Sequence, residues 1–214
     1  METPLDENSI EFRLSEGLSR LATVLGADDR ARAKALGLTA TQLSVIELLA
    51  GRPEGVGVGE IARHLAVTQP SATDSIIALE RKGLVEKVSP VGDRRASIVR
   101  LTVEGRQSTS AGVAVAGALT NAVSQLPEAR KEALLVTVIT LIRTLQEAGA
   151  IPVQRMCPTC QYFRPHHHAD PRQPHHCALV DAAFGDPELR VDCRDHRSPD
   201  PAQQAATWRA FTKG

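Results

Sequence analysis

The sequence predicts a mainly α-helical protein with a small β-hairpin, followed by a compact module that contains cysteine. Three observations support this fold class. Aromatic residues, which favour strands, make up only 3% of the chain. Apolar residues recur at helical spacing in several long segments. All four cysteines lie beyond residue 156, so the end of the chain differs chemically from the rest.

Charge and hydropathy restrict the class of protein without naming a partner. Hydrophobic residues make up 42% of the 214 residues, and Lys plus Arg equal Asp plus Glu at 25 each. A net charge of zero neither suggests nor excludes a nucleic-acid partner. The acidic N-terminus predicts no signal peptide, and the longest apolar stretch, residues 134–142, is too short to span a bilayer. We therefore expect a cytoplasmic protein with no membrane partner, in which cysteines favour metal or redox chemistry over disulfides.

The first predicted helix carries an apolar stripe. Residues 9–25 have helical periodicity, and the stripe consists of Leu14, Leu18, Leu21 and Leu25. Two interpretations fit the stripe equally well at this stage. It packs inside its own domain, or it packs against a second subunit.

Two further helices are predicted before residue 150. Residues 103–126 are rich in small side chains, and residues 128–148 are apolar around more than half of the helix circumference. A helix so apolar needs cover on two sides, and a domain of this size offers little. A subunit interface is the simplest explanation.

The middle of the chain alternates predicted helices with turn residues. Residues 39–50 predict a helix with Thr39 or Thr41 as its cap and Gly51 at its end, and the glycines of residues 55–59 predict a loop. GEIARHLAV then predicts a short helix, and Thr68 is expected to cap a second one that ends at Gly83. LVEKVSP and ASIVRLT predict two strands joined by turn residues.

A short helix, a tight turn, a second helix and a hairpin make a winged helix-turn-helix, which suits duplex DNA. A helix fits the major groove and presents its N-terminal residues to base edges. From Glu60 to Arg106, Lys and Arg outnumber Asp and Glu by eight to six, so the electrostatic contribution per subunit is modest. The candidate DNA-binding residues lie at the start of the second helix and at the hairpin tip: Thr68, Gln69, Ser71, Thr73, Asp74, Arg94 and Arg95.

The motifs LERKGLVEKV, DRRA and LTVEGR lie close together in this region. With the flanking helices, residues 10–148 resemble the MarR family of bacterial transcription regulators. The resemblance implies a homodimer joined by the first and last two helices, a palindromic operator in double-stranded DNA, and a pocket for a small-molecule effector. It also implies that Arg95 enters a minor groove and that Asp93 supports this arginine by a salt bridge. Asp74 departs from the family, in which many relatives carry a basic residue there, and this leaves the operator sequence open.

The four cysteines are spaced as a metal site requires: Cys157-x2-Cys160-x16-Cys177-x15-Cys193. A C-x-x-C pair places two thiolates on one turn, and two distant cysteines can complete a tetrahedral set. His176 and His196 are candidate additional ligands. The site suits a [4Fe–4S] cluster, which we prefer, or Zn²⁺. The ligand order loosely resembles that of high-potential iron–sulfur proteins, while free thiols in a disordered tail and a disulfide pair are the less favoured alternatives.

The sequence thus predicts four parts: an N-terminal dimerisation helix (1–37), a winged helix-turn-helix (38–106), C-terminal dimerisation helices (107–150) and a Cys/His-rich metal-binding extension (151–214). We expect a DNA-binding transcriptional regulator whose operator affinity responds to the cysteine site. An enzyme is disfavoured because no Ser/His/Asp constellation, P-loop or G-x-G-x-x-G motif occurs. The alternatives are a small-ligand-responsive repressor with a purely structural zinc and, more remotely, a metal-centred redox protein. The operator, the regulated genes and the direction of regulation are not encoded in any readable pattern.

Overall fold

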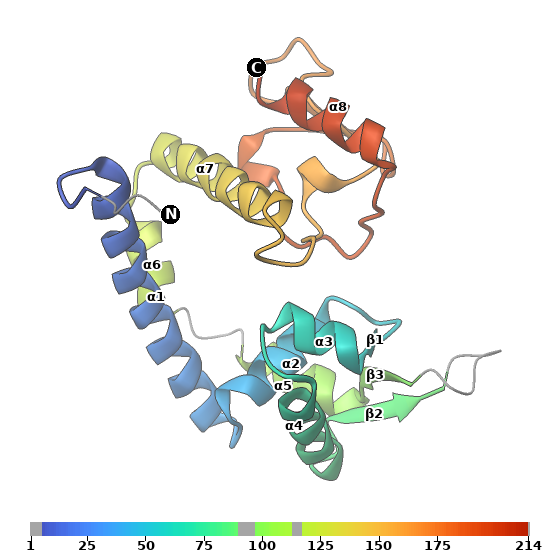
Figure 1. Ribbon diagram of the computed structural model, residues 1–214. Helices are drawn as coiled ribbons and strands as arrows, with labels where there is room; N and C mark the ends of the chain where they lie inside the picture. Colours follow the sequence, from blue (N-terminus) through green and yellow to red (C-terminus); the bar gives the residue numbers. More distant parts are fainter. Residues whose placement is uncertain (1–5, 90–96, 113–116, 214) are drawn as a thin grey trace. The chain divides into compact units, whose positions relative to one another are not determined.

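The computed structural model describes residues 6–89, 97–112 and 117–213, without the side chains of 109–112 (Figure 1). The chain divides into two compact units. One unit holds residues 1–61 and 68–125, and the other holds residues 126–214 together with residues 62–67.

Helix α1 (Ile10–Ala35) is longer than the sequence predicts. Ser9 caps its start, because the serine side-chain oxygen accepts a hydrogen bond from the Phe12 N–H. The predicted end at residue 25 is wrong by ten residues. The apolar stripe stops there, but the helix continues through residues 26–35, where Ala, Arg and Lys favour helix without any apolar period.

Helix α2 (Ala40–Ala50) forms the centre of the first unit. Thr39 and Gln42 make a capping box at its start, and Gly51 caps its end, as predicted. Six of its eleven residues are buried. The helix packs against α1, against the helix α4 and against the strand β3, both described next.

Helices α3 (Val58–His64) and α4 (Gln69–Arg81) form the predicted helix-turn-helix. Ala66 adopts a left-handed φ of 52° in the turn between them. Thr68 caps α4, as predicted, by accepting a hydrogen bond from the Ser71 N–H. One face of α4 is buried, and it consists of Ala72, Ile76 and Leu79.

A three-stranded antiparallel sheet completes the winged region, with β1 (Val56–Gly57), β3 (Ile98–Leu101) and β2 (Val85–Val88) in that order. The hairpin of β2 and β3 is the predicted wing, but β1 lies where the sequence predicted only a loop. Gly55 explains the close pairing of β1. It has a φ of +90°, and a Cβ built on it would lie only 2.9 Å from the Val99 carbonyl oxygen.

The single helix predicted over residues 103–126 is wrong. The structure has two helices, α5 (Val103–Gly112) and α6 (Ala118–Ser124), and Gly117 before α6 is extended with φ −66° and ψ 168°. Glycine has low helix propensity, so the described break at Gly117 falls at a residue that disfavours helix.

Gly105 of α5 lies against the neighbouring backbone. A Cβ at this position would collide with the Leu84 carbonyl oxygen. We expect Gly105→Ala to lower the free energy of unfolding by about 1–3 kcal/mol, because the backbone must shift to relieve the overlap. Urea unfolding followed by far-UV circular dichroism measures this change.

Gly17→Ala is the matched control for Gly105→Ala. Gly17 is also helical, but nothing lies within 4 Å of a Cβ built on it. This variant should gain about 0.5–1 kcal/mol, because alanine loses less backbone entropy in a helix. Equal unfolding midpoints for the two variants would contradict the close approach of α5 to Leu84.

The second unit joins α7 (Glu128–Glu147), a predicted helix, to a small irregular module. The strands of this module form an antiparallel sheet in the order β4-β5-β6. Its elements are the 3-10 turn η1 (Cys157–Thr159), β4 (Phe163–Arg164), β5 (His175–Cys177), β6 (Ala182–Phe184), the 3-10 turn η2 (Asp186–Glu188) and helix α8 (Pro201–Phe211).

One hydrophobic core holds this second unit together. Its buried residues come from α7, the module and α8: Ile139, Met156, Cys160, Phe163, Leu189 and Phe211. Trp208 of α8 packs against the same cluster. The cysteine-containing module is therefore a folded extension of α7.

Two helices leave apolar side chains exposed. On α1 the exposed row consists of Ile10, Leu14, Leu18, Leu21, Val24 and Leu25, between 39% and 67% exposed. On α7 the row consists of Leu134, Val138, Leu141 and Leu145, between 36% and 46% exposed. A single chain thus leaves both rows uncovered. Within the described part of the chain, no helix is both long and apolar enough to cross a membrane.

Candidate functional site

The N-terminal turn of α4 presents the polar residues that the sequence selected. Thr68, Gln69, Ser71 and Asp74 are exposed, and Thr73 is half-buried. The Oγ1 of Thr68 lies 2.8 Å from the Oγ of Ser71, and the hydroxyl of Thr73 donates to the Gln69 carbonyl at 2.8 Å. The hydroxyl groups are therefore held in fixed positions, and all five residues lie on one accessible end of the helix.

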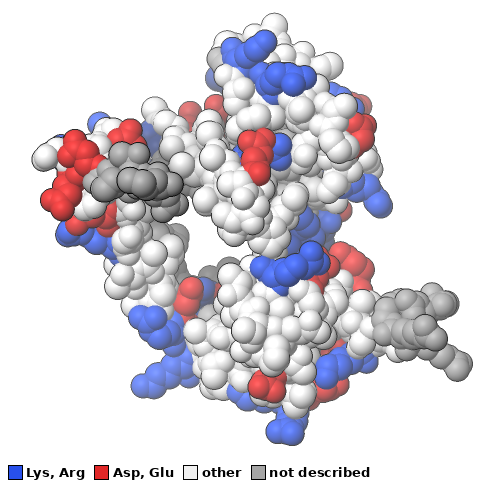
Figure 2. Space-filling model, viewed as in Figure 1, with Lys and Arg blue, Asp and Glu red and all other residues white. Residues whose placement is uncertain are grey.

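Ion pairs reduce the positive charge near the hairpin. The Arg100 Nε lies 2.8 Å from a Glu86 oxygen across β2 and β3, and the Lys87 Nζ lies 3.3 Å from a Glu80 oxygen on α4. Figure 2 shows Lys and Arg scattered among Asp and Glu on the viewed face, without one large basic patch. This agrees with the modest electrostatic contribution that the sequence predicts.

The predicted wing-tip residues Asp93, Arg94 and Arg95 lie outside the described residues. The strands that carry the wing are described, and their register pairs Val88 with Ile98. The intervening residues therefore begin and end at the same end of the hairpin.

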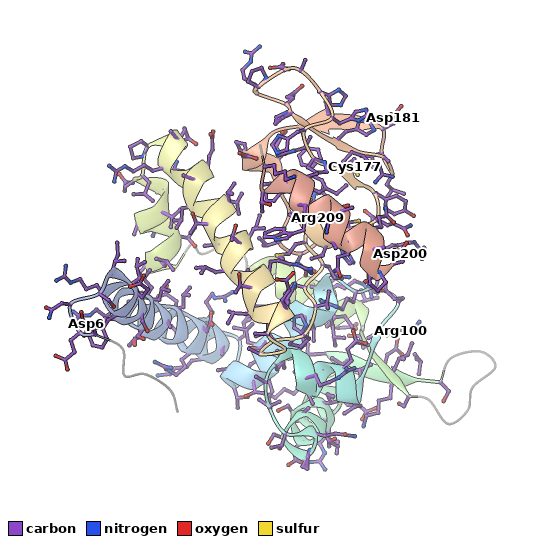
Figure 3. The ribbon with its side chains drawn as sticks, turned by 45° about the horizontal axis from the view of Figure 1, so that its top comes forward. Asp6, Arg100, Cys177, Asp181, Asp200 and Arg209 are labelled. Atoms are coloured by element: carbon purple, nitrogen blue, oxygen red, sulfur yellow. The ribbon has the colours of Figure 1, made fainter. Side chains whose placement is uncertain are left out.

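The four cysteines line one cavity of about 260 Å³ in the second unit. Cys157 belongs to η1, Cys160 directly follows it, Cys177 ends β5, and Cys193 lies between η2 and α8. Figure 3 labels Cys177 on the small sheet. Most other lining residues are apolar or aromatic: Tyr162, Phe163, Leu179, Val180, Ala182, Ala183 and Phe184; the remaining three are Glu188, Arg190 and Asp195.

Backbone hydrogen bonds bring these cysteines together. The Cys160 N–H donates to the Cys157 carbonyl at 2.9 Å and closes the tight C-x-x-C turn. Two further bonds join the turn to the distant segment: the Cys157 N–H donates to Arg190 at 3.0 Å, and the Cys193 N–H donates to Arg155 at 2.9 Å. The antiparallel pairing of β4 and β5 adds Cys177 beside Phe163.

Burial is the main influence on the acid–base behaviour of Cys157. Together with a smaller contribution from the neighbouring cysteines, burial raises the pKa of the Cys157 thiol to about 11, against the effect of a hydrogen bond from the Arg190 backbone. Such a thiol keeps its proton at neutral pH unless a metal displaces it. Metal binding here would therefore release protons.

Four thiols around one cavity form a donor set that both zinc and iron–sulfur clusters use. Four sulfur atoms bound to a single zinc ion at about 2.3 Å would lie only about 3.8 Å apart. Within residues 6–89, 97–112 and 117–213, no three His, Cys, Asp or Glu side chains are grouped tightly enough to bind one metal ion. Four thiol groups around an apolar cavity match the donor set of an iron–sulfur cluster.

The two candidate histidine ligands do not line the cavity. The His176 ring lies between other polar groups, with its Nδ1 3.2 Å from His168 and its Nε2 3.5 Å from Asp181. His196 Nε2 lies 2.8 Å from the Thr159 carbonyl oxygen. Burial, opposed by this hydrogen bond, lowers the pKa of His196. The structure gives His196 the role of joining two segments of the module.

His175 is a structurally important residue that the sequence reasoning missed. Its side chain is completely buried, and its Nε2 lies 2.8 Å from Asp186. Burial lowers the pKa of His175, although the Asp186 carboxylate acts in the opposite direction. The position of His175 in a strand was the available signal in the sequence. Successive residues of a strand point to opposite faces, so His175 and His176 cannot both face solvent in a sheet with one buried face.

Sequence comparison identifies the winged region. The model described as "MarR family" matches residues 36–96. The transcriptional activatory protein BadR of Rhodopseudomonas palustris is 36% identical over 102 residues, which are 46% of this chain and 55% of BadR. The chain therefore spans about half the length of this curated relative.

Solved structures support the same fold. CouR bound to a 23-mer DNA duplex is 27% identical, with a TM-score of 0.52, and the match covers 65% of this chain and 99% of CouR. A MarR-family regulator from Silicibacter pomeroyi is 21% identical, with a TM-score of 0.56, over 67% of this chain and 97% of that one. The matched residues, the sheet order and the helix-turn-helix agree: the chain contains a winged helix-turn-helix fold, and residues 36–96 are similar to the MarR family.

Proposed function

We propose that this protein is a DNA-binding transcriptional regulator that acts as a homodimer. The exposed polar start of α4, on a MarR-family winged helix, is the observation that carries the proposal. A helix of this kind enters the major groove with its N-terminal residues against base edges. The similarity to CouR, which was solved on a DNA duplex, supports a double-stranded operator, and the twofold symmetry of a homodimer would suit a palindromic one.

The two exposed apolar rows support the dimer. They lie on α1 and α7 and contain ten large side chains in all, six on α1 and four on α7. Rows of this kind in water favour association, because a second subunit removes them from solvent. A twofold dimer would present two copies of α4 to two half-sites of one operator.

The second part of the proposal is a [4Fe–4S] cluster held by Cys157, Cys160, Cys177 and Cys193. Its support is the convergence of all four cysteines on one cavity of about 260 Å³ with apolar walls. When bound, such a cluster supplies reversible one-electron chemistry. The residues of this chain supply the four sulfurs, exclude much of the solvent with aromatic side chains, and tie the ligand segments together.

We further propose that this site regulates operator affinity through α7. Ile139 of α7 and Met156, the residue before Cys157, share one buried core. Binding of a metal group would stabilise the module and therefore the packing on α7. If the outer row of α7 contacts the other subunit, the two states of the site favour different dimer geometries and different spacings of the recognition helices.

A visible absorption spectrum with metal analysis, on protein purified without oxygen, tests the cofactor first. We expect broad absorption near ~400 nm and about four irons per chain. A colourless protein with about one zinc per chain would show that the cofactor is a structural zinc ion and not a cluster. Mobility-shift titrations with and without the bound metal then test regulation, and equal affinities would leave only a structural role.

Arg95→Ala is expected to abolish binding to the operator while the dimer stays intact. The resemblance to the MarR family implies that this arginine enters a minor groove, where the negative potential of the narrow groove attracts its charge. Duplexes selected from a random pool on the wild-type protein supply the operator for a mobility-shift titration. Unchanged affinity would contradict the assigned role of the wing.

A further inference from the structure

Arg190 is the one basic residue among the described residues that line the four-cysteine cavity. Glu188 and Asp195, both acidic, line it as well. Once a metal group binds, the four cysteines add the charge of their thiolates. The positive charge of Arg190 thus stands alone against several negative groups at this site.

Two different groups of Arg190 contact two different cysteine sulfurs. Its backbone N–H donates to the Sγ of Cys157 at 3.3 Å, and its guanidinium Nη1 lies 3.8 Å from the Sγ of Cys193. Its carbonyl accepts a hydrogen bond from the Cys157 N–H at 3.0 Å. Arg190 is therefore fixed beside Cys157 by its backbone, and this holds the guanidinium near Cys193.

We propose that Arg190 sets the reduction potential of the metal group at this site by stabilising negative charge on the sulfurs of Cys157 and Cys193. The proposal rests on the cluster proposed above. The reduced cluster carries one electron more than the oxidised cluster. A positive charge and hydrogen bonds directed at the sulfurs therefore favour the reduced form.

Arg190→Gln isolates the contribution of the guanidinium, because the backbone N–H to Cys157 remains. We expect the ratio of reduced to oxidised cluster at a fixed potential to fall about tenfold, which is about 59 mV for a one-electron couple. A dithionite titration of the full-length holoprotein, followed by visible absorption and electron paramagnetic resonance, gives the midpoint potential. Arg190→Lys retains the charge but loses the planar fork, so a smaller shift in the same direction is expected.

Arg172→Gln is the matched control. It removes the same charge from an arginine of the same unit whose side chain is 91% exposed and does not line the cavity. If Arg190→Gln and Arg172→Gln have the same midpoint potential, the proposed role of Arg190 is overturned, while the proposal of a cluster is unaffected. If Arg190→Gln takes up no cluster, the uncharged variant Arg190→Met decides, because a potential equal to that of the control would overturn the proposal.

Failure of the underlying proposal has a different signature. A wild-type protein that contains zinc and no iron has no reduction potential to tune. That result would overturn the cluster and the role of Arg190 together, before any variant is made. If the wild-type protein contains the cluster and Arg190→Gln leaves the midpoint potential unchanged, only the inference about Arg190 is overturned.

Discussion

Replacing Cys160 by serine is expected to abolish binding of the proposed metal group. Cys160 is the buried member of the four cysteines, and its backbone closes the C-x-x-C turn. A serine hydroxyl is a poor ligand for a soft metal site. The iron content should fall from about four per chain to near zero, with loss of the absorption near ~400 nm.

The same variant should loosen the module without unfolding the winged region. Helices α2 and α4 and the strands of the wing belong to the other compact unit, whereas the core of the second unit includes Cys160 itself. Limited proteolysis should cut the variant after residue 150 and spare α2 and α4. Ala182→Ser serves as control, since it adds a hydroxyl at the cavity without removing a thiol. Full iron content in Cys160→Ser would refute its assignment as a ligand.

A charged residue in the middle of the α1 row is expected to convert the dimer into monomers. Leu18→Arg places a guanidinium within a row of exposed apolar side chains. Burying that charge without a partner costs far more than the leucine contributes. The mass measured by light scattering should fall from two chains to one, 23.0 kDa. Loss of the second recognition helix should weaken operator binding by about 10²–10⁴-fold.

Ala27→Arg is the matched control on the same helix. Nine residues beyond Leu18, it lies on the opposite face of α1 and is exposed. It adds the same charge, so dimer and operator affinity should both be retained. Leu18→Arg that remains dimeric with unchanged DNA binding would show that the α1 row is not part of the interface.

Local signals made several elements predictable from the sequence. Thr68 marked the start of α4 through its cap, and Gly51 marked the end of α2. The pairing of β1 was not predictable, because its hydrogen bonds come from β3, some forty residues away. The last ten residues of α1 were missed for another reason: they form helix without an apolar period, so no periodic signal marks them.

The candidate site was predictable in composition but not in detail. The spacing of the cysteines selected the residues that the fold brings to one cavity. It gave no indication of Arg190, whose contact with Cys157 spans 33 residues of chain. The adjacent histidines were indistinguishable by composition, yet only His175 is completely buried, since the strand turns His176 to its other face.

The burial of α7 by the module has a consequence for how such proteins can diverge. Ile139 is completely buried and Arg143 is 8% exposed, with its guanidinium 5.9 Å from the Trp208 ring. In a homologue that ends soon after α7, nothing from this module would cover these two positions. Such a homologue should carry a polar side chain at position 139, or bury that position in some other way. Position 139 therefore provides a sequence test that separates inheritance of the winged region alone from inheritance of both units.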